Sequence, residues 1–178
     1  MQCNKREESE SVELNKLLER VMEDTERLGI KTGCITGIVV KKGDHSFSAR
    51  CCKKQKYFSS TSIQEEFVIE VSESVLNIPV SSLQTIIAHE VLHTVKGCFG
   101  HTKKWKLYAK RMNDFMGYEI QRTTANLDMS GYTPSYNYML QCTLCGNEIG
   151  RRKRCSLIEH PEKYKCPRCA HASLVRVS

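Results

Sequence analysis

The sequence predicts an α+β fold in two parts, a larger part that combines helices with a small antiparallel sheet and a small β domain after it. Segments with apolar residues at helical spacing flank short β-branched runs, and this order predicts the first part. Two Cys-x-x-Cys pairs lie close together near the C-terminal end and predict the second. The 178 residues suffice for one domain of ordinary size and a small appendage.

Residues 1–9 are polar and show no apolar period, so we expect them to be disordered. An amphipathic helix is predicted next, over residues 10–28. Its apolar positions recur at helical spacing: Val12, Leu14, Leu17, Leu18, Val21 and Leu28. The first part of the fold is therefore predicted to span 10–125, beginning with this helix.

Three β-branched or alternating runs predict strands over 35–42, 47–53 and 67–72. The polar, Ser-rich stretch 54–64 between the last two is predicted to be a loop. We expect the three strands to form an antiparallel sheet across a later helix. The 67–72 strand is predicted to be the edge strand beside a cleft, where an extended peptide can pair with it.

The next helix is predicted to begin near Ser81. Gln84 follows three residues later, and this pattern predicts a capping box at the start of the helix. Its apolar positions again recur at helical spacing, at Leu83, Ile86, Ile87, Val91 and Val95. A largely buried helix is therefore predicted.

An HExxH pattern lies within this helix, and His101 follows after a short turn that contains two glycines. Two imidazoles one helical turn apart, with a carboxylate beside the first, are typical of a zinc site with its own base. A catalytic zinc needs three protein ligands and an open position for water. The pattern predicts three zinc ligands and one general base: His89, His93 and His101, with Glu90.

A further helix is predicted over 102–116, with Gly117 at its C-cap. The residues that follow are rich in Thr, Ser, Asn, Gly and Pro, which indicates a linker, placed at 126–137. Residues 138–178 remain, and we predict that they form a small β domain with short strands at 138–141, 164–165 and 174–177.

Four cysteines in this remainder have the spacing of a structural zinc ribbon: Cys142, Cys145, Cys166 and Cys169. Four thiolates close a tetrahedral shell and leave no position for water, so a second, structural zinc is expected. Ten cysteines without a secretory signal indicate a reducing compartment, so we expect a cytoplasmic protein, nucleoid-associated or nuclear depending on the host. No apolar run reaches the length of a membrane span.

The net charge of +7 is unevenly placed, and the last part of the chain carries a basic run. This run is Arg151, Arg152, Lys153 and Arg154. Clustered basic residues are the electrostatic footprint of a nucleic-acid contact, although a solvated surface also explains many such runs. We expect protein substrates and DNA, preferentially single-stranded, as partners, no membrane association, and a monomer.

Taken together, these motifs resemble the Spartan-related SprT-like zinc metalloproteases. The resemblance rests on HEVLH at 89–93, HTKKW at 101–105, FVIEVSESVL at 67–76 and the Cys-x-x-Cys pairs, and it covers most of residues 10–178. It implies a zincin-like protease domain with zinc on the three histidines, Glu90 as general base, and Trp105 packed behind the third ligand. Thr102 stands where relatives often have glycine.

The resemblance implies a zinc endopeptidase that cuts proteins at or near DNA, as in the proteolysis of DNA–protein crosslinks. Two alternatives stay open. One is a nucleic-acid-binding zinc protein without catalytic activity, which an intact Glu90 disfavours. The other is a metal-dependent hydrolase with a non-protein substrate.

Overall fold

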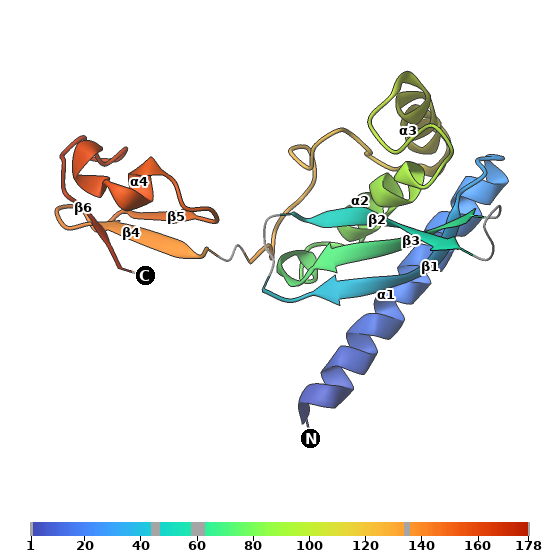
Figure 1. Cartoon of the computed structure of the whole chain (residues 1–178), viewed down its shortest axis with the longest axis horizontal. Coiled ribbons are helices and arrows are strands. Elements are labelled where there is room, and N and C mark those ends of the chain that lie inside the picture. The colour runs from blue at the N-terminus through green and yellow to red at the C-terminus, as the bar shows by residue number, and fades with distance from the viewer. Residues whose placement is uncertain (1, 44–46, 58–62, 134–135, 178) are drawn as a thin grey trace. The chain divides into compact units, whose positions relative to one another are not determined.

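In the computed structural model the chain forms two compact units, Met1–Thr133 and Pro134–Ser178, which we describe separately (Figure 1). The structure describes residues 2–43, 47–57, 63–133 and 136–177, of which 2–11, 56–57 and 63 are described by backbone alone. The division between the units falls inside the predicted linker. Together the units have an α+β fold with two small sheets.

The first helix, α1, spans Gln2–Arg27 and so begins inside the stretch 1–9 that we predicted to be disordered. Its second half buries the predicted apolar face, including Leu14 and Val21. Once that half is anchored, extending the helix by one residue costs little free energy. The Gln, Lys, Arg and Glu residues before it also favour the helical conformation. Among the described helices, α1 included, none is both long and apolar enough to cross a membrane.

The sheet of unit 1 is mixed, with the strand order β1-β3-β2, which corrects the antiparallel sheet that we predicted. β1 (Cys34–Lys41) pairs with β3 (Ile63–Ser72) in parallel, and β2 (Ala49–Tyr57) pairs with β3 antiparallel. β3 is therefore the central strand, and the prediction of an edge strand at 67–72 is wrong. β2 also extends through part of the predicted loop 54–64.

Composition explains why β3 is central and β2 is an edge. The face of β3 toward the helices carries Phe67, Ile69 and Val71, all of which are buried. β2 instead carries several lysines, and charged side chains are common on edge strands because they discourage pairing with other chains. β2 is also the strand that borders the cleft described below, through Ala49.

The helices cover one face of this sheet, with α1 against β1 and α2 (Val80–His93) against β2 and β3 (Figure 1). A short 3-10 turn, η1 (Glu73–Val75), joins β3 to the approach to α2. The predicted capping box is wrong, because Pro79 occupies the N-cap and no side chain caps the helix. Gln84 instead donates a hydrogen bond to the hydroxyl of Tyr118, 2.9 Å away.

The helix α3 spans Lys103–Met116 and ends at Gly117, whose φ of 73° is the left-handed conformation expected of a C-cap glycine. The chain after it does not leave the unit. Tyr118 and Ile120 are buried in the core, and Leu127, Met129 and Tyr132 pack against it. The first part of the predicted linker 126–137 thus belongs to unit 1.

Unit 2 contains a three-stranded antiparallel sheet with the order β5-β4-β6. Its strands are β4 (Tyr138–Cys142), β5 (Glu148–Arg151) and β6 (Leu174–Arg176), and it also contains α4 (Ser156–Glu159) and the 3-10 turn η2 (Pro161–Lys163). The strand predicted at 164–165 is wrong and β5 was missed. A run of two residues carries no period, and β5 forms because it pairs with β4.

Candidate metal centre and active site

Two of the candidate zinc ligands come from α2, which is buried along most of its length. His89 and His93 lie one turn apart with their ring centroids separated by 5.0 Å. Helical periodicity places them on one face, and the packing of α2 against the sheet and α1 holds that face in position. Both imidazoles are therefore carried by a rigid helix.

His101 reaches the same point from the turn that follows α2. Gly97 adopts a left-handed φ of 83° in this turn, and Thr102 caps α3 by accepting a hydrogen bond from the N–H of Trp105. The Thr102 hydroxyl also donates to the Gly97 carbonyl, 3.0 Å away. Thr102, the departure noted in the sequence, thus secures both ends of the turn that carries His101.

The nitrogen atoms of the three histidines converge. Nε2 of His101 lies 2.9 Å from Nε2 of His89, and one ring nitrogen from each of the three lies within 4.8 Å of the others. Nδ1 of His89 is 2.8 Å from the Gln121 carbonyl, and Nδ1 of His93 is 2.9 Å from the Cys98 carbonyl. Because a carbonyl only accepts, both Nδ1 atoms carry the proton, and both Nε2 lone pairs are left for a metal.

The protonation of the cluster also suits a metal. Burial, reinforced by the neighbouring His93 and His101, lowers the pKa of His89 to about 4. Burial likewise lowers the pKa values of His93 and His101. The imidazoles are neutral at pH 7, the form that binds zinc, and three such nitrogens match the donor set of a catalytic zinc at about 2.0–2.1 Å.

Glu90 lies beside His89 and is 9% exposed. Burial raises the pKa of its carboxyl group to about 7, and a hydrogen bond with the backbone of Cys51 acts in the opposite direction. A carboxyl group with a pKa near 7 is suited to take and return a proton at neutral pH. The residue predicted as the base is thus next to the candidate metal site and shielded from bulk water.

A cleft of about 310 Å³ opens at His89 and Glu90. One wall is α2, with Thr85 and Ile86, and another is the start of β2, with Ser48 and Ala49. The third is the segment 117–127, which we call the cleft segment. A second hollow of about 170 Å³ shares Thr85, Glu119 and Leu127 with the first and continues along α2. The metal site therefore lies at an accessible groove.

A model of the SprT-like family matches residues 32–126, which include the three histidines, Glu90 and nearly all of the cleft segment. The chain belongs to the SprT-like family. This is generally a family of metalloproteases. Searches of curated proteins and of solved structures found no match.

The only tryptophan of this SprT-like domain lies against all three histidines. Trp105 is 1% exposed, and its ring centroid is 4.5 Å from that of His101 and 4.8 Å from that of His89. It stacks on His93 at 5.5 Å with an interplanar angle of 20°. The indole therefore restricts the rotation of the three rings. The family resemblance implied this position for Trp105, behind the third ligand.

Sequence reasoning missed the contribution of the cleft segment, whose polar composition resembles a linker. Asn113 on α3 binds both backbone groups of Ile120: its side-chain oxygen accepts from the N–H at 2.8 Å and its amide donates to the carbonyl at 3.0 Å. The next residue, Gln121, presents its carbonyl to His89. The alternation of Tyr118 and Ile120, both buried, was the signal in the sequence that this stretch packs on the core.

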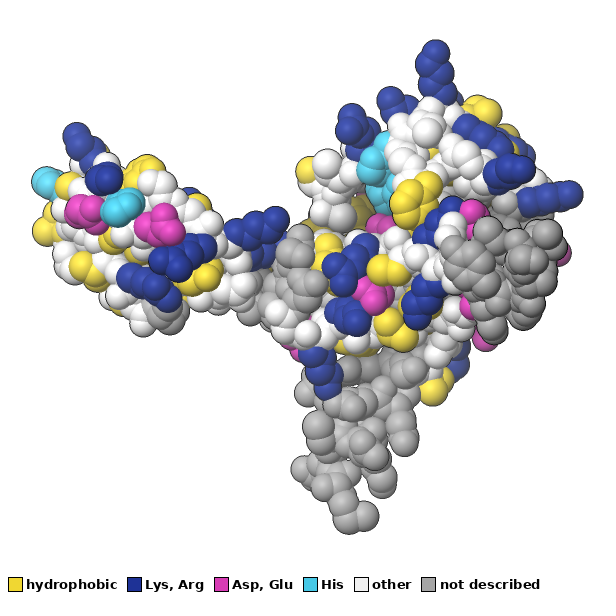
Figure 2. All heavy atoms as spheres, in the orientation of Figure 1, with side chains coloured by type: hydrophobic (Ala, Val, Ile, Leu, Met, Phe, Trp, Pro, Cys, Tyr) yellow, Lys and Arg dark blue, Asp and Glu magenta, His cyan; other side chains and the backbone are white. Residues whose placement is uncertain are grey.

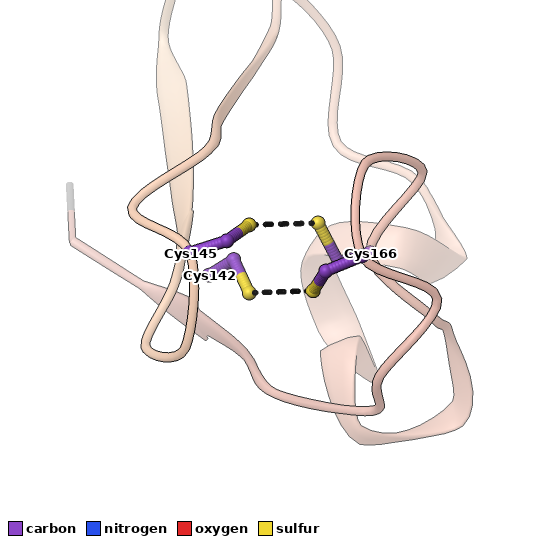
Figure 3. A group of neighbouring side chains, drawn as sticks. Cys142, Cys145 and Cys166 are labelled. Carbon is purple, nitrogen blue, oxygen red and sulfur yellow. Dashed lines mark hydrogen bonds between the residues drawn. The ribbon is translucent and has the colours of Figure 1, made fainter.

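The four predicted cysteines of unit 2 also converge. The sulfur atoms of Cys142 and Cys169 lie 3.6 Å apart, as do those of Cys145 and Cys166 (Figure 3). Each Cys-x-x-Cys pair is followed by a residue with a left-handed φ, 69° at Gly146 and 60° at Ala170. The spacing suits a tetrahedral zinc, in which sulfurs at about 2.3 Å from the metal are about 3.8 Å apart. The described part of the chain thus contains two candidate metal sites.

The basic run lies on the surface of unit 2, at and after the end of β5. Three of its members are exposed and Arg152 is half-buried. Arg154 forms an ion pair of 3.0 Å with Glu159, and the Arg151 guanidinium donates to the Gly150 carbonyl. The four side chains are close in sequence, but Arg154 is partly neutralised.

We predict that Asn113→Ala weakens metal binding at the histidine site about tenfold, because partners beyond the direct ligands orient those ligands. The loss of both hydrogen bonds to Ile120 frees the Gln121 carbonyl that fixes His89. Titration with Co²⁺ measures the effect, since thiolate absorption bands separate the cysteine site from the histidine site. Asn126→Ala is the control, because it also removes a hydrogen bond to the cleft segment, at Glu119, away from Gln121. Equal affinity in the two variants would contradict this role of Asn113.

Proposed function

We propose that this protein is a zinc-dependent endopeptidase with a zincin-like catalytic domain. The observation that carries the proposal is the convergence of three neutral imidazoles and a buried carboxyl group at one accessible cleft. Membership of a family that generally consists of metalloproteases supports the same reaction class. A structural metal site needs neither the carboxyl group nor the cleft.

The residues of the site divide the chemistry between them. His89, His93 and His101 would hold zinc, which when bound polarises a carbonyl group and lowers the pKa of a water molecule. Glu90 accepts a proton from the attacking water and returns it to the leaving amine nitrogen. Trp105 and the Gln121 carbonyl keep the imidazoles in position. The cleft confines the substrate beside Glu90.

The edge of β2 suits a polypeptide substrate. β2 pairs with β3 on one side only, and the residues at its start line the cleft. An extended peptide that adds to this edge forms backbone hydrogen bonds that do not depend on its sequence. Pairing with β2 therefore brings a peptide bond past Glu90 with broad sequence tolerance, as expected of an endopeptidase and unlike a hydrolase of small non-protein substrates.

We expect Glu90→Gln to lower the rate of cleavage of denatured casein and histone by about 10²–10⁴-fold, because the attacking water loses its proton acceptor. The substitution preserves shape and leaves the three histidines intact. Zinc content and melting temperature are therefore expected to stay constant. Glu13→Gln, an exposed carboxyl group on α1, serves as the control. Full activity in Glu90→Gln would show that the base is another group or that the reaction is different.

We further propose that the substrates are proteins at or near DNA, preferentially single-stranded. The support is electrostatic. The basic run of unit 2 is largely exposed, and Lys and Arg side chains also gather on the α3 side of unit 1, around the histidines (Figure 2). Basic side chains on both units give a polyanion two places to bind, which would keep an attached protein close to the protease domain.

Reversing the charge at Arg151, Arg152 and Arg154 is expected to weaken binding to a single-stranded oligonucleotide at least about tenfold and to flatten its dependence on salt, because fewer counterions are released. Fluorescence anisotropy from about 50 to 200 mM salt measures both quantities. Cleavage of a short free peptide is expected to stay constant. An unchanged affinity and salt dependence would remove the basic run from the DNA surface.

A further inference from the structure

Hydrolysis of a peptide bond places negative charge on the carbonyl oxygen, and hydrogen-bond donors fixed around that oxygen usually stabilise the transition state most. Tyrosine and histidine side chains are common donors to such an oxygen. His45 and the side chain of Tyr57 lie outside the described residues. The Tyr118 hydroxyl accepts from Gln84 and donates to Asp24, at 2.9 and 2.8 Å, and Tyr108 lies on α3 outside the cleft lining.

The cleft itself offers a different donor. Arg122 is the single Lys or Arg among the described residues that line the cleft, where it accompanies His89 and Glu90. A guanidinium keeps its charge at all working pH values and presents five N–H donors in a fixed plane.

The backbone of Arg122 is fixed relative to the metal ligands. Asn113 holds Ile120 through two hydrogen bonds, and Gln121 contacts His89 directly. Arg122 follows immediately, so its Cα is set by the same contacts. Its side chain is exposed, and no ion pair to another described residue occupies the guanidinium. The guanidinium thus extends from a fixed backbone position in the cleft lining and is available to a substrate.

We propose that Arg122 is a catalytic residue that donates hydrogen bonds to the carbonyl oxygen of the scissile peptide bond. The inference rests on the proposed peptidase activity. As the water oxygen bonds to the carbonyl carbon, the π electron pair moves to the carbonyl oxygen, which accepts the Arg122 N–H groups, while the water proton passes to Glu90. When the C–N bond breaks, the carbonyl reforms and Glu90 gives its proton to the amine. Arg122 keeps all its protons throughout.

The test measures kcat, KM and inhibitor binding in zinc-loaded wild type, Arg122→Lys and Arg122→Gln. The peptide substrate is blocked at both ends and has no acidic side chain. We expect Arg122→Gln to lower kcat about 100-fold with KM nearly constant, because a transition-state donor is lost. Arg122→Lys, which keeps the charge but not the planar donor pair, is expected to fall between. Lys31→Gln, an exposed cation away from the cleft, is the control.

A phosphinic tripeptide supplies a readout that does not depend on turnover. Its tetrahedral phosphorus and charged oxygens imitate the transition state, so its Kd should rise in Arg122→Gln by about the same factor as kcat falls. Equal zinc content in all variants, measured by elemental analysis, shows that the metal site is intact.

Each outcome decides the proposal. Unchanged kcat and unchanged phosphinate binding in Arg122→Gln would overturn it. A loss confined to KM, seen only with substrates that carry a free C-terminal carboxylate or an acidic side chain, would also overturn it and assign Arg122 to substrate selection. If wild type cleaves no peptide, the proposed peptidase activity fails, and the phosphinate Kd alone then decides whether Arg122 binds a tetrahedral oxyanion.

Discussion

The SprT-like domain depends on one constraint: three imidazole nitrogens from two separate segments must converge on one point. Two are fixed by the period of α2, but the third depends on a turn whose Gly97 conformation and Thr102 cap hold His101 in place. Carbonyl groups of Cys98 and Gln121 orient two rings, and Trp105 packs against all three. These supports hold the three rings close to one point.

The burial that positions the histidines also sets the electrostatics of the site. The same burial of α2 that lowers the pKa of His89 to about 4 raises that of Glu90 to about 7. Neutral imidazoles and a readily protonated carboxyl group result from the hydrophobic packing of one helix. The candidate four-cysteine site of unit 2 would use a metal differently, because four sulfurs would fill the shell and the metal would stabilise a unit with a very small core.

The sequence predicts structure well where the signal is local, and less well where strands pair that are distant in the sequence. Helical period and ligand spacing suffice for α2, the three histidines and each Cys-x-x-Cys pair, since the members of each pattern lie close together in the sequence. Strand order depends on contacts between distant residues, so the runs that predicted the strands did not reveal that β3 lies between β1 and β2. The start of the predicted linker was misassigned because the packing of Leu127, Met129 and Tyr132 on the core is masked by polar neighbours.

The two candidate metal sites differ in kind, since one offers three imidazoles and an open position and the other offers four thiolates, and we propose that both bind zinc. The most direct measurement is zinc content by elemental analysis in wild type and in the variant His89→Ala/His93→Ala/His101→Ala, both prepared without chelator. We expect about two zinc ions per chain in wild type and about one in the variant, retained by the cysteines. One zinc in wild type, or two in the variant, would show that the two sites do not both bind zinc as proposed.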